Sequence, residues 1–328
     1  MKKTGLPTFM LLFISFMSQS QQVYQRELLL MGCDFGITVV ADEQKEADVY
    51  IQKAIDEITR IEKLISSWDV ASQTSLVNKN AGLKPVKVHP LLFELIQHSL
   101  AISKLTDGAF DITFASLDPV WKFDGSMKRM PAKEEISASV SNIGFQNIQL
   151  NDKDTTVFLL KKGMKIGFGA IGKGFAADKA KHLLMQLGVT GGIINASGDL
   201  NVWGTKSNGM DWTVAITNPL KKQKAFAHLP IHNGAVATSG NYEKFVTIDG
   251  KKYSHIINPK TGYPSEGLVS VTVFSPKAEL CDALATAIFV MGKEVGIDRI
   301  NQLPKTECIL IDEEGNVFTS DNIKLELQ

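Results

Sequence analysis

The fold class can be inferred from one segment of the sequence, Val246-Thr247-Ile248-Asp249-Gly250-Lys251-Lys252-Tyr253-Ser254-His255-Ile256-Ile257. Two runs of strand-forming residues, Val246–Ile248 and Tyr253–Ile257, flank Asp249-Gly250, a dipeptide that favours the tight turn of a β-hairpin. Further strand-like runs are Gly192–Asn195, Trp212–Ile216, Leu268–Phe274 and Cys308–Ile311. Strands joined by hairpins, with helices inserted in clusters, predict an α+β fold with a largely antiparallel sheet.

Four helices are expected between these strands. In the first, isoleucines recur every three or four residues from Ile51 to Ile65, which gives the helix one apolar face. The expected ranges are Ala47–Ser66, His89–Leu105, Lys173–Leu187 and Ala278–Met291. The last two end at Gly188 and Gly292, residues suited to a helix C-terminus. We expect one domain over residues 21–328, with a helical subdomain inserted near residues 45–135.

Charge and cysteine content exclude several classes of protein. The 328 residues carry 35 basic and 35 acidic side chains, for a formal net charge of zero. This balance argues against a protein held mainly by a basic surface on nucleic acid or anionic lipid. The 3 cysteines are too few for a disulfide scaffold.

The first 20 residues have the layout of a secretory signal peptide. Met1-Lys2-Lys3 precedes an apolar run, Leu6–Met17, that is short for a membrane span, and Ser18 and Ser20 offer a cleavage site before Gln21. The protein is therefore expected to be exported and periplasmic. The alternative is an uncleaved anchor that attaches it to the outer face of the inner membrane.

A second N-terminal feature is the run Leu30-Met31-Gly32-Cys33, which resembles a lipoprotein acylation box. Charged Arg26 and Glu27 interrupt the apolar stretch before it. We therefore expect Cys33 to belong to the folded domain.

Two glycine-containing segments are candidates for a binding site. In Gly108–Thr113, a turn could bring Asp111 into a strand at a pocket rim, or Asp111 could simply cap the turn. In Gly167–Gly174, a glycine-rich loop opens a helix, where backbone N–H groups can bind phosphate and Lys173 adds a positive charge. The loop has neither the Walker A spacing nor the dinucleotide fingerprint, and a packing role is the alternative.

Two polar positions are candidates for catalysis. His255, placed on a strand, could act as a base near neutral pH, although a lone histidine is often structural. Asp282 and Thr286 are four residues apart and share one face of an otherwise apolar helix. Oxygen ligands of this kind suit Mg²⁺, whereas the alternative is an acidic residue stabilised by the helix dipole.

Taken in order, these segments resemble the ApbE family of FAD:protein FMN transferases. The matching segments span most of the chain: Met31-Gly32, Ser66-Ser67-Trp68 with Ser75 and Asn78, Gly108–Thr113, Gly169–Gly174, Ser197-Gly198-Asp199, Ala237–Tyr242, His255–Gly262 and Asp282–Ala287.

The resemblance implies a T-fold-like domain and Mg²⁺-dependent transfer of FMN from FAD to a threonine or serine hydroxyl, with release of AMP. It implies acceptor flavoproteins in membrane electron-transfer complexes of the Na⁺-translocating quinone reductase or Rnf type. By correspondence, His255 and Asp282 are catalytic, and the Ala170 carbonyl, Asp282 and Thr286 bind the metal. The residues that correspond to FAD contacts are Met31, Trp68, Ala109, Phe110, Asp111, Gly167, Lys173 and Ile256.

Two positions depart from the family pattern. Gly167 replaces an aspartate expected to contact FAD, and Ser197-Gly198-Asp199 replaces Gly-Gly-Asp. The rival hypotheses are an FAD pyrophosphatase that releases FMN and AMP, and a non-catalytic exported FAD-binding protein.

Overall fold

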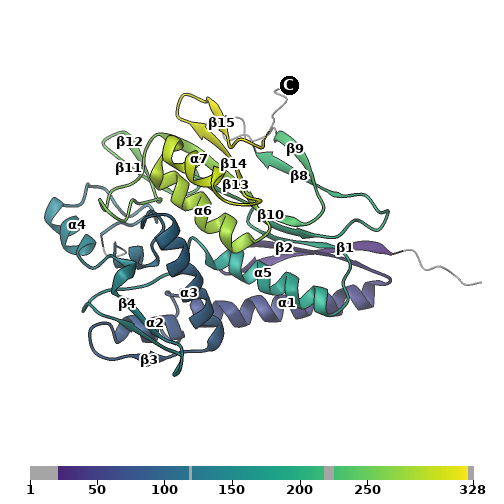
Figure 1. Ribbon diagram of the computed structural model, residues 1–328, viewed down its shortest axis with the longest axis horizontal. Coiled ribbons are helices and arrows are strands. Elements are labelled where there is room, and N and C mark those ends of the chain that lie inside the picture. Colours follow the sequence, from purple (N-terminus) through teal and green to yellow (C-terminus); the bar gives the residue numbers. More distant parts are fainter. Residues whose placement is uncertain (1–20, 118–119, 218–224, 324–328) are drawn as a thin grey trace, which may run out of the picture.

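The structure is a computed structural model that describes residues 21–117, 120–217 and 225–323 (Figure 1). The predicted signal peptide, residues 1–20, lies outside the described residues. None of the helices in the described ranges combines the length and hydropathy needed to cross a bilayer.

An eight-stranded sheet forms the centre of the molecule, in the order β1-β2-β6-β7-β10-β13-β14-β15. Every neighbouring pair is antiparallel. The strands are β1 (Gln22–Leu30), β2 (Cys33–Ala41), β6 (Gly192–Ala196), β7 (Asp199–Trp203), β10 (Gly234–Gly240), β13 (Leu268–Ser275), β14 (Glu307–Asp312) and β15 (Val317–Thr319).

The run that resembles an acylation box forms the tip of the β1–β2 hairpin. Leu30 pairs with Cys33, and the two residues between them have positive φ values, 51° at Met31 and 73° at Gly32. Two consecutive left-handed residues make a turn whose twist suits an antiparallel hairpin. The expectation that Cys33 belongs to the folded domain is confirmed.

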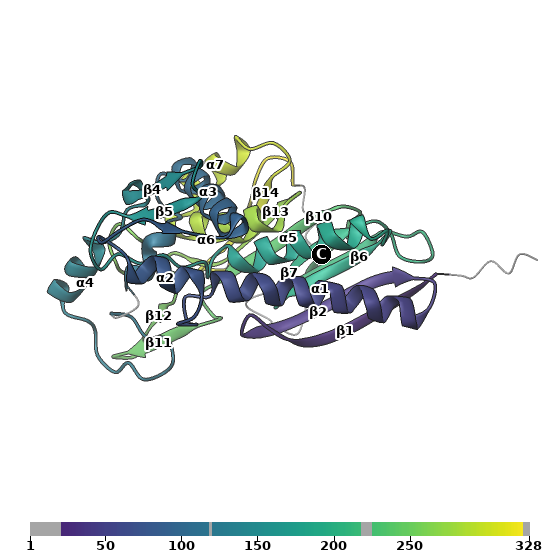
Figure 2. The same cartoon turned by 90° about the horizontal axis from the view of Figure 1, so that it is seen from below.

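Helices α1 (Gln44–Ile65), α5 (Gly172–Gln186), α6 (Ala278–Met291) and α7 (Lys293–Asn301) form a layer beside the sheet (Figures 1 and 2). The apolar face of α1 is buried along its length, from Ala47 to Ile65, and packs on β2 and α5. The hairpin of β8 (Trp212–Thr217) and β9 (Ala225–Ile231) forms a separate two-stranded sheet. Its Trp212 and Val214 pack against Val40, Val202 and Val236.

The region inserted between α1 and α5 contains more than helices. It holds α2 (Gln73–Lys79), α3 (Pro90–Leu105), α4 (Lys133–Val140) and short 3₁₀ helices at Ile112–Leu117 and Phe145–Asn147. A small sheet, β3 (Val86–Lys87)-β5 (Thr156–Leu159)-β4 (Ile148–Asn151), lies beside them and extends the region beyond residue 135.

The predicted hairpin is present as β11 (Phe245–Ile248) and β12 (Lys251–Ser254), with Asp249 and Gly250 at φ values of 50° and 78°. The prediction that the second strand reaches Ile257 is wrong. The strand ends at Ser254, whose hydroxyl accepts a hydrogen bond from the Ile256 N–H and turns the chain. The other five predicted strands and the four predicted helices are confirmed to within about three residues at each end.

Candidate active site

Three elements converge at the start of α5. Lys173 lies in the first turn of that helix, and its Nζ is 2.7 Å from a carboxylate oxygen of Asp199 and 3.4 Å from one of Asp282. Asp199 begins β7 directly after a turn in which Ser197 and Gly198 have positive φ. Asp282 comes from α6. Although burial disfavours the ammonium ion, the two carboxylates raise the pKa of Lys173 above its usual value.

Asp282 is 5% exposed and faces the first turn of α5. The Gly174 N–H donates to its second oxygen at 3.2 Å. Burial raises the pKa of Asp282 to about 6, with Lys173 opposing the shift and Asp199 adding to it. A buried carboxyl with this pKa binds a cation most readily once it has lost its proton.

Of the other two predicted metal ligands, Thr286 lies on α6 and Ala170 lies just before α5. Thr286 follows Asp282 by one turn of α6, and its hydroxyl is 3.3 Å from that of Ser239 on β10. Ala170 precedes α5 by two residues. The Gly174 N–H, one of the first-turn donors that have no acceptor within the helix, bonds Asp282. Among the described residues, no backbone N–H donates to that carbonyl.

This donor set fits magnesium. It offers one carboxylate, one hydroxyl and one backbone carbonyl that accepts no backbone N–H among the described residues, all of them hard oxygens of the kind Mg²⁺ prefers. Within the described ranges no group of three or more His, Cys, Asp and Glu side chains is placed to hold a metal ion.

Asp111 has a structural position. Its carboxylate is 5% exposed and accepts hydrogen bonds from the Thr113 N–H (2.8 Å), the Thr113 hydroxyl (2.6 Å) and the Phe145 N–H (2.8 Å). It leads into a 3₁₀ helix, so the strand expected there is absent. The capping alternative describes this residue, and its neighbours Ala109 and Phe110 are buried with it.

The remaining predicted FAD contacts border the glycine-rich loop or the His255 segment. A Cβ placed on Gly172 would lie 3.8 Å from the Met31 methyl group, and one on Gly167 would lie 3.6 Å from the Ser67 hydroxyl. Trp68 follows Ser67 and is 86% exposed. Ile256 is buried beside His255.

His255 lies in the loop after β12, and its side chain is well placed to accept a proton. Its Nδ1 is 3.0 Å from the Lys244 carbonyl, which can only accept, so Nδ1 carries the hydrogen and Nε2 is the free acceptor. The ring packs edge-on against Phe123 at 6.3 Å. Burial lowers the pKa of His255 despite that hydrogen bond, which favours the neutral form at pH 7.

Comparison with known proteins identifies the family. The ApbE family profile matches residues 31–310. The chain belongs to the ApbE family. A FAD:protein FMN transferase of Klebsiella pneumoniae is 30% identical over 93% of this chain and 94% of its own length. One of Escherichia coli K12 is 30% identical over 88% and 84%. The crystal structure of the ApbE protein of Thermotoga maritima superposes with a TM-score of 0.86 at 31% identity, covering 94% of this chain and 100% of that one.

Two site residues were not predicted individually from the sequence. Ser239 of β10 supports Thr286, and Glu243 follows the Ala237–Tyr242 segment shared with the ApbE family. Burial of the Glu243 carboxyl, together with Asp199, raises its pKa to about 7. The only indication of Ser239 in the sequence was its place in the Ala237–Tyr242 segment. Nothing in the sequence indicated Glu243.

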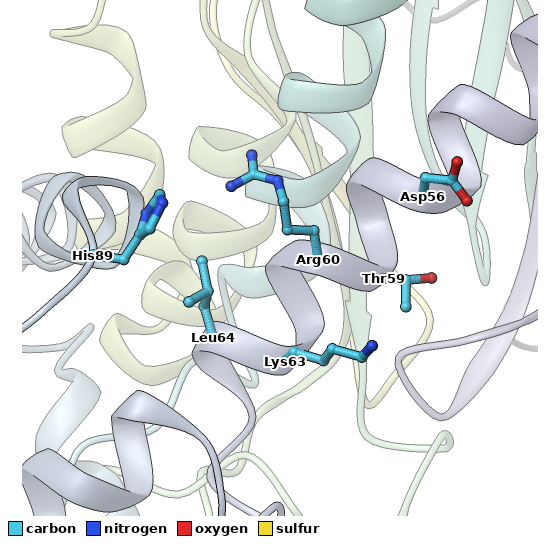
Figure 3. Close-up of a pocket in the computed structure, with 6 residues that line it drawn as sticks. All are labelled: Asp56, Thr59, Arg60, Lys63, Leu64 and His89. Carbon is cyan, nitrogen blue, oxygen red and sulfur yellow. The ribbon is translucent and has the colours of Figure 1, made fainter.

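A hollow on the outer side of α1 is separate from these ApbE-family residues. It has a volume of about 500 Å³ and is lined by Asp56, Thr59, Arg60, Lys63, Leu64 and His89 (Figure 3). Arg60 is paired with Glu57 on the same helix at 2.7 Å. None of the predicted site residues lines this hollow.

Proposed function

We propose that this protein transfers FMN from FAD to a threonine or serine hydroxyl of an acceptor flavoprotein and releases AMP. The observation that carries the proposal is the convergence of Lys173 and Asp282 on the first turn of α5. Thr286 lies one turn further along α6, and among the described residues the Ala170 carbonyl just before α5 accepts no backbone N–H. Relatives that match over nearly their whole length are FAD:protein FMN transferases, which supports the same reaction.

The start of α5 suits a pyrophosphate. The first N–H groups of a helix carry partial positive charge, and Lys173 adds a full charge beside them. Asp282, Thr286 and the Ala170 carbonyl would hold Mg²⁺. When bound, the ion would neutralise charge on the phosphate oxygens. The loop from Gly167 to Gly172 leaves the backbone open for close approach of a ligand at Gly169, where an added Cβ would meet nothing nearer than 3.9 Å.

His255 is the candidate for activating the acceptor. Its Nε2 takes the proton as the acceptor oxygen attacks the FMN-side phosphorus, and the bond from that phosphorus to the AMP oxygen breaks. The products are an FMN phosphoester on the acceptor and AMP. Asp199 keeps Lys173 oriented during this step through the 2.7 Å ion pair.

The proposal extends to location and partners. A secretory signal at residues 1–20 would place the enzyme in the periplasm, where the outward-facing subunits of Na⁺-translocating quinone reductase or Rnf-type complexes are the acceptors we propose.

The test is incubation of the purified protein with FAD, Mg²⁺ and candidate acceptor subunits, followed by mass spectrometry of the acceptor and measurement of AMP. Transfer predicts an FMN adduct on one hydroxyl with an equal amount of AMP. AMP formed at the same rate without labelling would indicate a pyrophosphatase. Stoichiometric FAD binding with no AMP would indicate a binding protein. Labelling by Asp282→Ala at the parental rate would show that the metal assignment is wrong.

A further inference from the structure

The two helices that carry the site cap each other. The N-cap residues of α5 and α6, Ile171 and Lys277, supply no side-chain cap. Instead, the Gly174 N–H at the start of α5 donates to Asp282 of α6 at 3.2 Å. In return, the first two N–H groups of α6, those of Ala278 and Glu279, donate to Asp178 of α5 at 3.0 Å each. Each helix start is therefore satisfied by an aspartate from the other helix.

This exchange fixes the register of α5 against α6. The backbones meet at Gly174, where an added Cβ would lie 2.3 Å from the Ala278 carbonyl oxygen. Asp282 accepts from the N–H of Gly174 itself, and Asp178, one turn further along α5, accepts from the N–H groups of Ala278 and Glu279. A shift of either helix along its axis would break hydrogen bonds at both places.

A third element, strand β7, also contacts Asp178. The amide of Asn201 on β7 donates to Asp178 at 2.6 Å, and its carbonyl oxygen accepts from Lys181 at 3.0 Å. Lys181, only 9% exposed, also donates to the Val202 carbonyl and to Asn233. Asn201 and Asp199 are two residues apart on one strand and face α5 together. The strand that orients Lys173 through Asp199 thus orients Asp178 through Asn201.

We propose that Asp178 is a positioning residue for the magnesium site. By capping α6, it sets where the Asp282 carboxylate and the Thr286 hydroxyl lie relative to the Ala170 carbonyl. The proposal rests on the proposed function for the identity of the ion. Residues that orient metal ligands typically change metal affinity by about 10- to 100-fold when they are removed.

The variants are Asp178→Ala, which removes both acceptors of the cap, and Asp178→Asn, which keeps one oxygen and tests the idea if the alanine variant does not fold. The control is Lys179→Met, because the neighbouring Lys179 pairs with Glu94 at 2.7 Å rather than with α6. Two readouts are used on the full chain: calorimetric titration of Mg²⁺ in the presence of FAD, and hydrogen exchange of the Gly174 amide.

We expect Asp178→Ala to weaken Mg²⁺ binding by about 10- to 100-fold and Asp178→Asn to weaken it by less. The Gly174 amide should exchange about tenfold faster in Asp178→Ala, although its own acceptor, Asp282, is unchanged. The amide of Ile194, in the middle of the main sheet, should keep its parental rate. Lys179→Met should change neither readout.

Two results would overturn the proposal: Mg²⁺ affinity within twofold of the parent in both Asp178 variants, or exchange accelerated equally at Gly174 and Ile194. The first would show that Asp178 does not position the magnesium ligands, and the second would make it a general stability residue. If the proposed function is wrong, the parent protein will form no FMN adduct on the acceptor. Hydrogen exchange of the Gly174 amide would still show whether Asp178 orders the start of α5.

Discussion

Replacing Gly174 with alanine is expected to damage the site more than any other single methyl group added to the glycine-rich loop. The new Cβ would lie 2.3 Å from the Ala278 oxygen, 2.5 Å from its carbonyl carbon and 2.7 Å from the Glu279 Cα. All three atoms belong to the backbone of α6, so no side chain can rotate away to relieve the clash.

The size of the effect follows from these distances. To reach an ordinary contact of 3.4 Å, α6 must retreat from α5 by about 1 Å. Overpacking of this kind typically costs about 1–3 kcal/mol of unfolding free energy, against a gain of up to about 1 kcal/mol from replacing a helical glycine. The same displacement separates Asp282 from the Gly174 N–H, and a misplacement of about 1 Å can cost about 100-fold in rate.

The assay pairs urea unfolding with AMP release from FAD in the presence of acceptor. The matched control is Gly169→Ala, five residues earlier, where the nearest atom to the new Cβ would be the Phe114 ring at 3.9 Å. We expect the control to unfold at the parental urea concentration and Gly174→Ala to lose both stability and rate. Parental stability and rate in Gly174→Ala would refute the reasoning, because they would mean that the helices do not touch there.

Three further predictions concern charge and the departures from the family pattern. Protonation of Asp282, whose pKa is about 6, competes with Mg²⁺ binding. The transfer rate at limiting Mg²⁺ should therefore fall as the pH drops through about 6, and excess Mg²⁺ should move the midpoint of the pH–rate profile lower. A midpoint that does not depend on Mg²⁺ would contradict this. Burial raises the pKa of Glu243 from 4.5 to about 7, so its ionisation costs unfolding free energy progressively as the pH rises between these two values. Glu243→Gln should therefore unfold at higher urea than the parent at pH 8 but at the same urea at pH 4, and unfolding equal to the parent at both pH values would argue against the shift. A Cβ added to Gly167 would lie 3.0 Å from the Cβ of Ala115. Gly167→Asp should therefore strengthen FAD binding, measured by flavin fluorescence, only when it is combined with Ala115→Gly. Stronger binding in the single variant would show that Ala115 moves to make room.

Local patterns were sufficient to predict the helices and several strands. The isoleucine spacing of α1 and the Asp249-Gly250 turn act over a few residues, and both features are present in the structure. The β1 and β2 strands were not predicted, although Cys33 was expected in the folded domain, because the Leu30–Cys33 run carries no common hairpin signature. Its Met31-Gly32 turn lacks the Asn-Gly or Asp-Gly pair that usually marks one.

The site was predictable only as a set of residues. The Asp282 and Thr286 spacing predicts a shared helix face, but the approach of Lys173 depends on contacts between residues more than 100 positions apart. Asp111 shows that one local pattern can fit two different structures. A glycine turn followed by an acidic residue fits both a pocket rim and a cap, and only the positions of Thr113 and Phe145 distinguish the two. Asn78 likewise could not be placed from local sequence, because its side chain forms two hydrogen bonds with the backbone of Ile166, 88 residues away.

The backbone contact between Gly174 and Ala278 also bears on how turnover proceeds. The close approach and the aspartate hydrogen bonds at both helix starts hold α5 and α6 together, so we expect the metal-binding half of the site to move as one rigid body. The β11–β12 hairpin, in contrast, forms a sheet of its own beside His255 and packs on Trp121 and Ile136. We expect the slow step of a cycle, entry of FAD or escape of AMP, to follow the opening of this hairpin.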